Sequence, residues 1–310
     1  MAQVGRRSAP RLPGSRRPRR RPAAPRNRVS LLDLVTSVLV VHAHPDDETI
    51  STGALIAESV VRDIRVSLLT ATRGERGEVV PGPLSDLEGT AALTTERERE
   101  LQRATAALGV SERFWLGEPP AREAGLAPRR YRDSGMTWIR PGLAGPAADD
   151  EDDALAIAPL DEVVADVAAL ILALRPALVI SYDSGGGYGH PDHVRMHVAA
   201  LAACRAVGTP FAEILHEPAD DGEWFDLDRH LTTVTTALRC HASQLTVDGS
   251  DIVHSGGQRD PIKTGIGLRV LPGQSASLRD PSQGLTDVVD SHLDPDSLGR
   301  HGTRGRQKGV

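Results

Sequence analysis

The most informative stretch of the sequence is Ser37-Val38-Leu39-Val40-Val41-His42-Ala43-His44-Pro45-Asp46-Asp47-Glu48. Its first five residues are mostly β-branched and apolar, which predicts a short buried strand. Histidines and carboxylates follow at once, beginning with His42 and His44. The strand therefore ends in side chains of the kind that bind metal ions or transfer protons.

Strands and helices alternate along the rest of the chain. The pattern of apolar residues predicts further strands at 64–70, 114–116, 177–182 and 211–215, and helices at 49–60, 94–108, 160–174, 193–206 and 231–245. A long loop, rich in Pro, Gly, Arg and Asp, is expected at 117–158. This order predicts an α/β fold with a Rossmann-like, mostly parallel sheet and helices on both faces. Ligands bind beyond the carboxyl ends of the strands in such sheets.

Both ends of the chain differ from the middle in composition. Residues 1–30 contain ten arginines and no carboxylate, a pattern also found in nucleic-acid-binding or membrane-binding tails and in transit peptides. Five prolines in the same segment prevent an amphipathic helix. We therefore expect a disordered Arg/Pro-rich extension at 1–33, one catalytic domain at 34–247, and an irregular, poorly ordered tail at 248–310.

The overall composition excludes several classes of protein. Aromatic residues make up 3% of the chain, which argues against nucleic-acid binding by base stacking. The two cysteines, Cys204 and Cys240, provide neither a disulfide framework nor a thiolate metal site. No apolar stretch is long enough to suggest a membrane span or a secretory signal. We expect a cytoplasmic protein with a small-molecule substrate and no nucleic-acid or membrane partner; its oligomeric state stays open.

Five of the eleven histidines lie in two short segments that each follow a predicted buried strand: 42, 44, 190, 193 and 197. A catalytic zinc site needs about three His or carboxylate ligands and one open position for water. Two histidines and one aspartate would suffice, and a second carboxylate beside them would serve as general base. The alternative is that the carboxylates at 46–48 only cap a helix and that the histidines only satisfy local hydrogen bonds. That alternative does not explain why the same residue types occur at two strand ends.

Other motifs are incomplete. His193 and His197 form an H-x-x-x-H pair, but Val194 stands where a metallopeptidase helix needs Glu, so His197 is expected to pack or to support the site. The glycine-rich run 185–189 lacks the spacings of phosphate-binding loops. No G-x-S-x-G is present, which leaves a serine hydrolase without support.

The two histidine segments resemble a known family. Ala43-His44-Pro45-Asp46-Asp47-Glu48 and Gly187-Tyr188-Gly189-His190-Pro191-Asp192-His193 are similar to the motifs of the LmbE/PIG-L metal-dependent deacetylases. Within that family the chain most resembles the mycothiol-pathway N-acetylglucosaminyl-inositol deacetylases, also through the segments 73–79, 131–136 and 241–244. The resemblance covers about residues 35–247.

The resemblance implies a role for each residue of the motifs. It implies metal ligation by His44, Asp47 and His193, with Zn²⁺ as the default ion and Fe²⁺ as an alternative. It implies four residues for catalysis: Asp46 as general base, His190 as general acid, Tyr188 to polarise the amide carbonyl, and Asp192 to orient His190. It implies substrate binding by Glu78, Arg97 and Asp133.

Three functions remain open at this point. The first is a zinc-dependent hydrolase that removes an N-acetyl group from an N-acetylglucosaminyl substrate, with the mycothiol precursor as one candidate. The second is an amidase acting on a mycothiol conjugate or another amide metabolite, since this chain is shorter than the deacetylases before Leu231 and the resemblance ends near residue 248. The third is a non-catalytic module that binds metal or sugar. Asp46 and His190 argue against it, because binding alone needs neither a base nor an acid.

Overall fold

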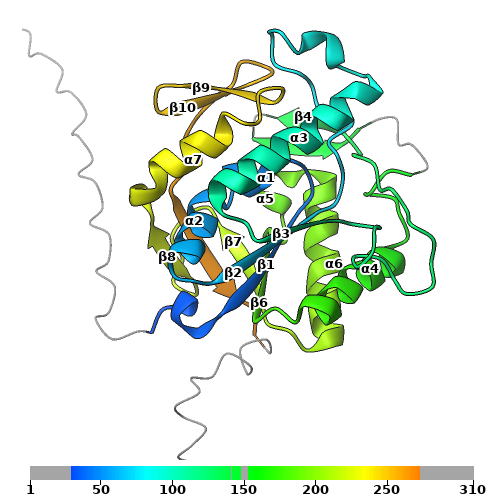
Figure 1. Cartoon of the computed structure of the whole chain (residues 1–310), viewed down its shortest axis with the longest axis vertical. Coiled ribbons are helices and arrows are strands. Elements are labelled where there is room, and N and C mark those ends of the chain that lie inside the picture. The colour runs from blue at the N-terminus through cyan, green and yellow to red at the C-terminus, as the bar shows by residue number, and fades with distance from the viewer. Residues whose placement is uncertain (1–28, 141, 148–152, 273–310) are drawn as a thin grey trace, which may run out of the picture.

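The computed structural model describes residues 29–140, 142–147 and 153–272, and its centre is a seven-stranded sheet (Figure 1). The strand order is β3-β2-β1-β6-β7-β12-β8. The strands of this sheet are β1 (Ser37–His42), β2 (Arg65–Thr70), β3 (Glu112–Trp115), β6 (Leu178–Ser181), β7 (Phe211–Leu215), β8 (Glu223–Asp226) and β12 (Gly265–Val270).

Five neighbouring strands of the sheet, from β3 to β7, are parallel. Strands β2 and β3 lie on one side of β1 in the sheet, and β6 and β7 lie on its other side. The strand order therefore reverses between β1 and β6. A crevice forms beyond the carboxyl ends of the strands at such a switch point, and ligands bind there.

Both faces of the sheet are covered by helices. Alternate residues of β1 enter two separate cores, with Val38 and Val40 on one side and Leu39 and Val41 on the other. The first core contains residues of α2 (Gly53–Val61), α3 (Ala91–Leu108) and α7 (Leu231–Leu238); the second contains residues of α4 (Leu160–Leu174) and α6 (Pro191–Val207). The expected mostly parallel sheet with helices on both faces is confirmed.

The expected tail does not begin at residue 248. A three-stranded sheet contains β9 (Leu245–Asp248), β10 (Asp251–His254) and β11 (Arg259–Pro261), and β12 then enters the main sheet antiparallel to β7 and β8. The prediction of irregular chain is wrong for 248–272. These strands are short, and their apolar residues are mostly separated by polar residues or glycine, so they lack an apolar run. Strands β9 to β11 pair with their neighbours in sequence, whereas β12 pairs with the distant strands β7 and β8.

The predicted start of the domain at residue 34 also differs from the structure. Leu31 and Leu32 are buried in a single 3₁₀ turn, Leu31–Leu34, so residues 29–33 do not belong to a disordered extension. The remainder of the two predicted terminal segments, 1–28 and 273–310, lies outside the described residues.

Two further elements differ from expectation. The loop predicted at 117–158 contains a hairpin of β4 (Met136–Arg140) and β5 (Leu143–Pro146), and the helix predicted at 231–245 ends at Leu238. Within the described ranges, no helix combines the length and the apolar character needed to cross a bilayer.

Candidate metal and catalytic site

Two turns bring the histidine segments together at the switch point. The first follows β1 and leads into the short helix α1 (Asp47–Ile50); the second follows β6 and passes through α5 (Gly186–Gly189) into α6. His190 is the N-cap of α6, and Pro191 occupies its first turn, where the missing N–H costs nothing. Because β1 and β6 are parallel neighbours, both turns lie at the same edge of the sheet (Figure 1).

Three side chains form a triangle of donor atoms. His44 Nδ1 lies 3.3 Å from Asp47 Oδ2, His193 Nε2 lies 3.3 Å from Asp47 Oδ1, and the two ring nitrogens are 3.3 Å apart. Ligands at ~2.0–2.1 Å from a tetrahedral ion are about 3.3–3.4 Å from one another. The spacing of these three residues therefore fits a tetrahedral metal ion with one open position.

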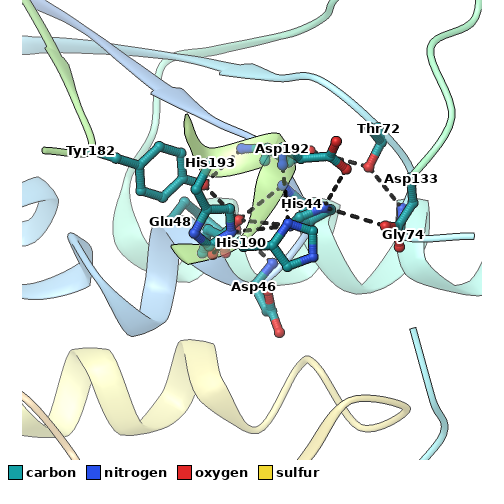
Figure 2. Close-up of polar contacts among 12 residues, drawn as sticks. His44, Asp46, Glu48, Thr72, Gly74, Asp133, Tyr182, His190, Asp192 and His193 are labelled. Atoms are coloured by element: carbon teal, nitrogen blue, oxygen red, sulfur yellow. Dashed lines mark hydrogen bonds and ion pairs between the residues drawn. The ribbon is translucent and has the colours of Figure 1, made fainter. Parts of the chain in front are cut away.

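The opposite nitrogen of each imidazole has a hydrogen-bond acceptor. His44 Nε2 lies 3.1 Å from Asp192 Oδ2 (Figure 2). His193 Nδ1 lies 3.2 Å from the carbonyl oxygen of Gly186. A proton on each of these nitrogens leaves His44 Nδ1 and His193 Nε2 with free lone pairs. This pairing of a ligating imidazole with a second acceptor is typical of protein metal sites.

Tyr182 holds the Asp47 carboxylate in place, a role that the sequence did not predict. The Tyr182 hydroxyl accepts a hydrogen bond from Ala43 N at 2.8 Å and donates its proton to Asp47 Oδ2 at 2.7 Å. The Tyr182 ring also stacks on His193, with centroids 4.1 Å apart. Burial would raise the pKa of Asp47, but His193 and His44 hold it well below its usual value, so Asp47 is an anion.

Asp192 takes a different position from the one expected. Its carboxylate, fully buried, contacts His44 Nε2 and accepts hydrogen bonds from the backbone N–H and the hydroxyl of Ser134. The expectation that this carboxylate orients His190 is wrong, because only the backbone N–H of Asp192 reaches His190 Nδ1, at 3.2 Å. The N-cap geometry of α6 turns the side chain of Asp192 towards His44 instead.

Asp46 has a strained backbone and an unpaired carboxylate. Its φ of 111° lies in a region that residues other than Gly rarely adopt. No hydrogen bond or ion pair with another described residue engages the Asp46 side chain, which extends away from the imidazoles in Figure 2. Burial and the adjacent charge of Asp47 raise the pKa of Asp46 to about 8. A bound cation nearby would lower that value again.

His190 lies against both metal-type histidines. Its ring centroid is 4.5 Å from that of His44 and 4.9 Å from that of His193. Burial, followed by the proximity of these two imidazoles, lowers the pKa of His190 to about 2. The ring is therefore neutral, and because Nδ1 accepts from the N–H of Asp192, its proton is on Nε2.

Tyr188 stands at the outer edge of the cluster. The residue is 38% exposed, and its ring meets the rings of His193 and His190 edge-on, with centroids 5.2 and 6.1 Å apart. The glycines on either side give α5 its irregular backbone, and Gly187 has a φ of 70°. Tyr188 therefore lies on the solvent side of the cluster.

The three expected substrate-binding residues are not equally close to this cluster. Asp133 is buried 3.6 Å from His44 Nε2, while Glu78 is exposed and accepts a hydrogen bond from Ser255. Arg97 is only 2% exposed, and its guanidinium donates to the carbonyl oxygens of Gly74, Gly77 and Glu78. In this structure Arg97 fixes the loop that follows β2.

The two remaining histidines of the two segments, His42 and His197, pack beside the site without joining the donor triangle. His42 is buried and its Nε2 lies 2.9 Å from Thr52 Oγ1; burial lowers the pKa of His42 to about 4. His197 is buried as well, and its Nδ1 contacts the carbonyl oxygen of Tyr182 at 2.9 Å. Neither ring joins the triangle of donors, which agrees with the packing role expected for His197.

Comparison with known proteins points to one family. Residues 39–204 match the family model PIG-L, described as GlcNAc-PI de-N-acetylase. The chain is 46% identical over 172 residues to a 1D-myo-inositol 2-acetamido-2-deoxy-alpha-D-glucopyranoside deacetylase of Kineococcus radiotolerans, covering 56% of this chain and 45% of that protein. It is 35% identical over 274 residues to the deacetylase of the same name from Actinosynnema mirum, covering 76% of this chain and 89% of that protein.

Coverage of these relatives is uneven. The matched region spans about half the length of the relatives from Kineococcus radiotolerans and Saccharopolyspora erythraea, 45% and 54% respectively. Among solved structures, N,N'-diacetylchitobiose deacetylase from Pyrococcus horikoshii matches with a TM-score of 0.53 and 20% identity, over 78% of this chain and 85% of that chain. That likeness shows a shared fold. Together with the family match, these findings show that the chain belongs to the PIG-L family.

Proposed function

We propose that this protein is a metal-dependent hydrolase that removes the acetyl group from an N-acetylglucosaminyl compound. The observation that carries the proposal is the triangle of His44, Asp47 and His193, with its 3.3 Å edges. A non-catalytic metal site would need no unpaired carboxylate and no neutral, proton-bearing imidazole beside it, yet Asp46 and His190 supply both.

The proposed metal is zinc, held by His44 Nδ1, Asp47 and His193 Nε2. Zinc suits a site of two imidazoles and one carboxylate with an open position, and ferrous iron would fit the same donors. When bound, the ion would act as a Lewis acid on the amide carbonyl and lower the pKa of the attacking water towards about 7. His44 and His193 keep the required tautomers through Asp192 and Gly186.

Side chains of the protein carry out the proton transfers in the proposed reaction. Asp46 accepts a proton from the attacking water, a role that suits a carboxylate whose pKa lies near neutrality or above its usual value. His190 as general acid would first have to take up a second proton, which its lowered pKa opposes. We therefore propose that Asp46 passes the proton it has taken from the water to the leaving amine, while the Nε2 proton of His190 stays on the ring and donates a hydrogen bond to the reacting amide. Tyr188, whose hydroxyl stays protonated at neutral pH, donates a hydrogen bond to the developing oxyanion.

The proposed substrate is a small amino sugar, with the substrate named for the relatives from Kineococcus radiotolerans and Actinosynnema mirum as the first candidate. Asp133 lies near enough to the cluster to accept hydrogen bonds from sugar hydroxyls. Arg97 contributes by shaping the loop at 74–78, and Glu78 lies at the outer end of that loop.

An acetate-release assay tests this proposal. Purified protein, loaded with zinc, is given a panel of N-acetylglucosaminides with and without an inositol aglycone. We expect release from at least the inositol compound, and we expect Asp46→Asn to keep its metal while kcat falls about 10²- to 10⁴-fold. Absence of release across the panel, or undiminished turnover by Asp46→Asn, would contradict the proposal.

A further inference from the structure

A buried acid–imidazole pair lies directly behind Asp46. Glu48 and His241 are both 0% exposed, and Glu48 Oε1 lies 2.8 Å from His241 Nε2. The two residues are 193 positions apart in the chain. Neither belongs to the donor triangle, and the mechanism proposed above uses neither of them. Stability alone does not explain a pair that is fully removed from water, because two apolar residues of similar size would often stabilise the fold as well as a buried ion pair does.

The second oxygen of Glu48 reaches the strained turn. Glu48 Oε2 accepts a hydrogen bond from the backbone N–H of Asp46 at 2.9 Å. Asp46 is the residue with a φ of 111°, a conformation that costs about 1–3 kcal/mol and persists only where its surroundings hold it. One carboxylate therefore connects the peptide of Asp46 to the imidazole of His241.

His241 is itself firmly anchored. Its Nδ1 lies 3.3 Å from Gln244 Nε2, which leaves the Nε2 proton for Glu48. The turn that contains it is fixed by Glu100 of α3, whose two carboxylate oxygens accept the backbone N–H and the hydroxyl of Ser243 at 2.6 and 2.7 Å. The turn that carries His241 is thus held by α3, while the imidazole contacts Glu48 and Thr49 of α1.

We propose that Glu48 and His241 form a positioning pair, which holds the Asp46 backbone in its strained conformation so that the carboxylate presents itself to the attacking water. The inference rests on the proposed function. Among the described residues, neither side chain has a hydrogen bond or ion pair with the side chains of His44, Asp47 or His193, so the pair acts through Asp46. It also explains why the segment 241–244, far from the histidine motifs in sequence, belongs to the site.

The competing explanation is that Glu48 and His241 merely stabilise the fold. The chain offers a matched control for that explanation in Glu58 and His230, another buried pair with a 2.8 Å contact, which joins α2 to the turn before α7. His230→Leu removes a comparable buried interaction without touching Asp46. Its effect on stability measures what losing such a pair costs in this fold.

The test compares three changes at position 241 in the full-length, zinc-loaded protein. His241→Leu removes the donor, His241→Asn keeps a polar group too short to reach Glu48, and His241→Gln places an amide N–H near the position of Nε2. We expect Leu and Asn to lower kcat about 10- to 100-fold, with KM and zinc content unchanged, and Gln to restore most of the activity. His230→Leu should leave kcat unchanged.

Two further measurements separate positioning from stability and from the proposed function. In an Asp46→Asn background, His241→Asn should cause no additional loss of kcat, because its effect passes through Asp46. Crystal structures of the His241→Asn and wild-type proteins should show φ of Asp46 leaving the positive region only in the variant. This second readout needs no turnover, so it decides the inference even if wild-type protein releases no acetate. Additive kinetic losses, or an unchanged Asp46 backbone, would overturn it.

Discussion

Tyr182→Phe is a direct test of how the carboxylate of Asp47, the proposed metal ligand, is held. The substitution removes one oxygen, which donates to Asp47 Oδ2 at 2.7 Å and accepts from the backbone N–H of Ala43 at 2.8 Å. The ring remains, so its stacking on His193 is preserved. Two consequences follow, one for metal affinity and one for the stability of the metal-free protein.

The magnitudes can be worked out from these two hydrogen bonds. A hydrogen bond to a charged group contributes about 1.5–3 kcal/mol, which corresponds to about 10- to 100-fold in an equilibrium constant. Loss of the bond to Asp47 should therefore weaken zinc binding by about that factor, the range found for groups that support metal ligands. The orphaned N–H of Ala43 should lower the free energy of unfolding by about 1–3 kcal/mol, whether or not metal is bound.

Zinc affinity is measured by competition with a chromophoric chelator, and stability by urea unfolding of the metal-free protein. Tyr131→Phe is the matched control, because the Tyr131 hydroxyl is equally buried and donates to Asp166 at 2.9 Å, away from the donor triangle. It should cost similar stability and leave zinc affinity unchanged. Equal zinc affinity of Tyr182→Phe and wild type would refute the assignment of Asp47 as a ligand supported by Tyr182.

Three more outcomes are expected. Asp192→Asn should weaken zinc binding about tenfold in the same chelator competition, because His44 Nε2 loses an anionic acceptor. Zinc at about 1,000 times its Kd should raise the free energy of unfolding by about 4 kcal/mol, and EDTA should reverse this without unfolding the protein. Burial would raise the pKa of Glu58, but hydrogen bonds from Arg229, His230 and Arg62 lower it from 4.5 to about 2. Glu58→Gln should therefore cost about 2 kcal/mol in urea unfolding at pH 7, and the difference should disappear as the pH falls from about 4.5 towards 2.

The sequence was sufficient for the parts of the fold that depend on local pattern. The apolar runs before His42 and before Tyr182 mark β1 and β6, and parallel neighbours deliver their following turns to one edge of the sheet. The meeting of His44, Asp47 and His193 follows from that topology. Strand β12 could not be found in the same way, because only Ile266 and Leu268 of its side chains are buried in a core and its paired residues lie 39 to 58 positions earlier.

Supporting residues were harder to predict than the donors themselves. Tyr182 has the sequence pattern of an ordinary strand residue, and its role depends on a hydroxyl that meets Asp47 across 135 positions. Ser134 reaches Asp192 across 58 positions. The wrong role expected for Asp192 has the same origin, since adjacency to His190 in sequence says nothing about which face of α6 the carboxylate occupies.

The distance of each residue from its strand suggests how chemistry and substrate choice are divided in this fold. His44 stands two positions beyond the end of β1, so little backbone freedom separates it from the rigid sheet, as a metal ligand requires. Asp133 follows β3 by 18 positions, and Glu78 follows β2 by eight. Loops of that length tolerate changes that a metal site would not. In the proposed deacetylase, the donors and the proton-transfer groups can therefore stay fixed while the loops after β2 and β3 adapt to different amino sugars. Exchange of those two loops between relatives should then alter KM for different aglycones before it alters zinc binding.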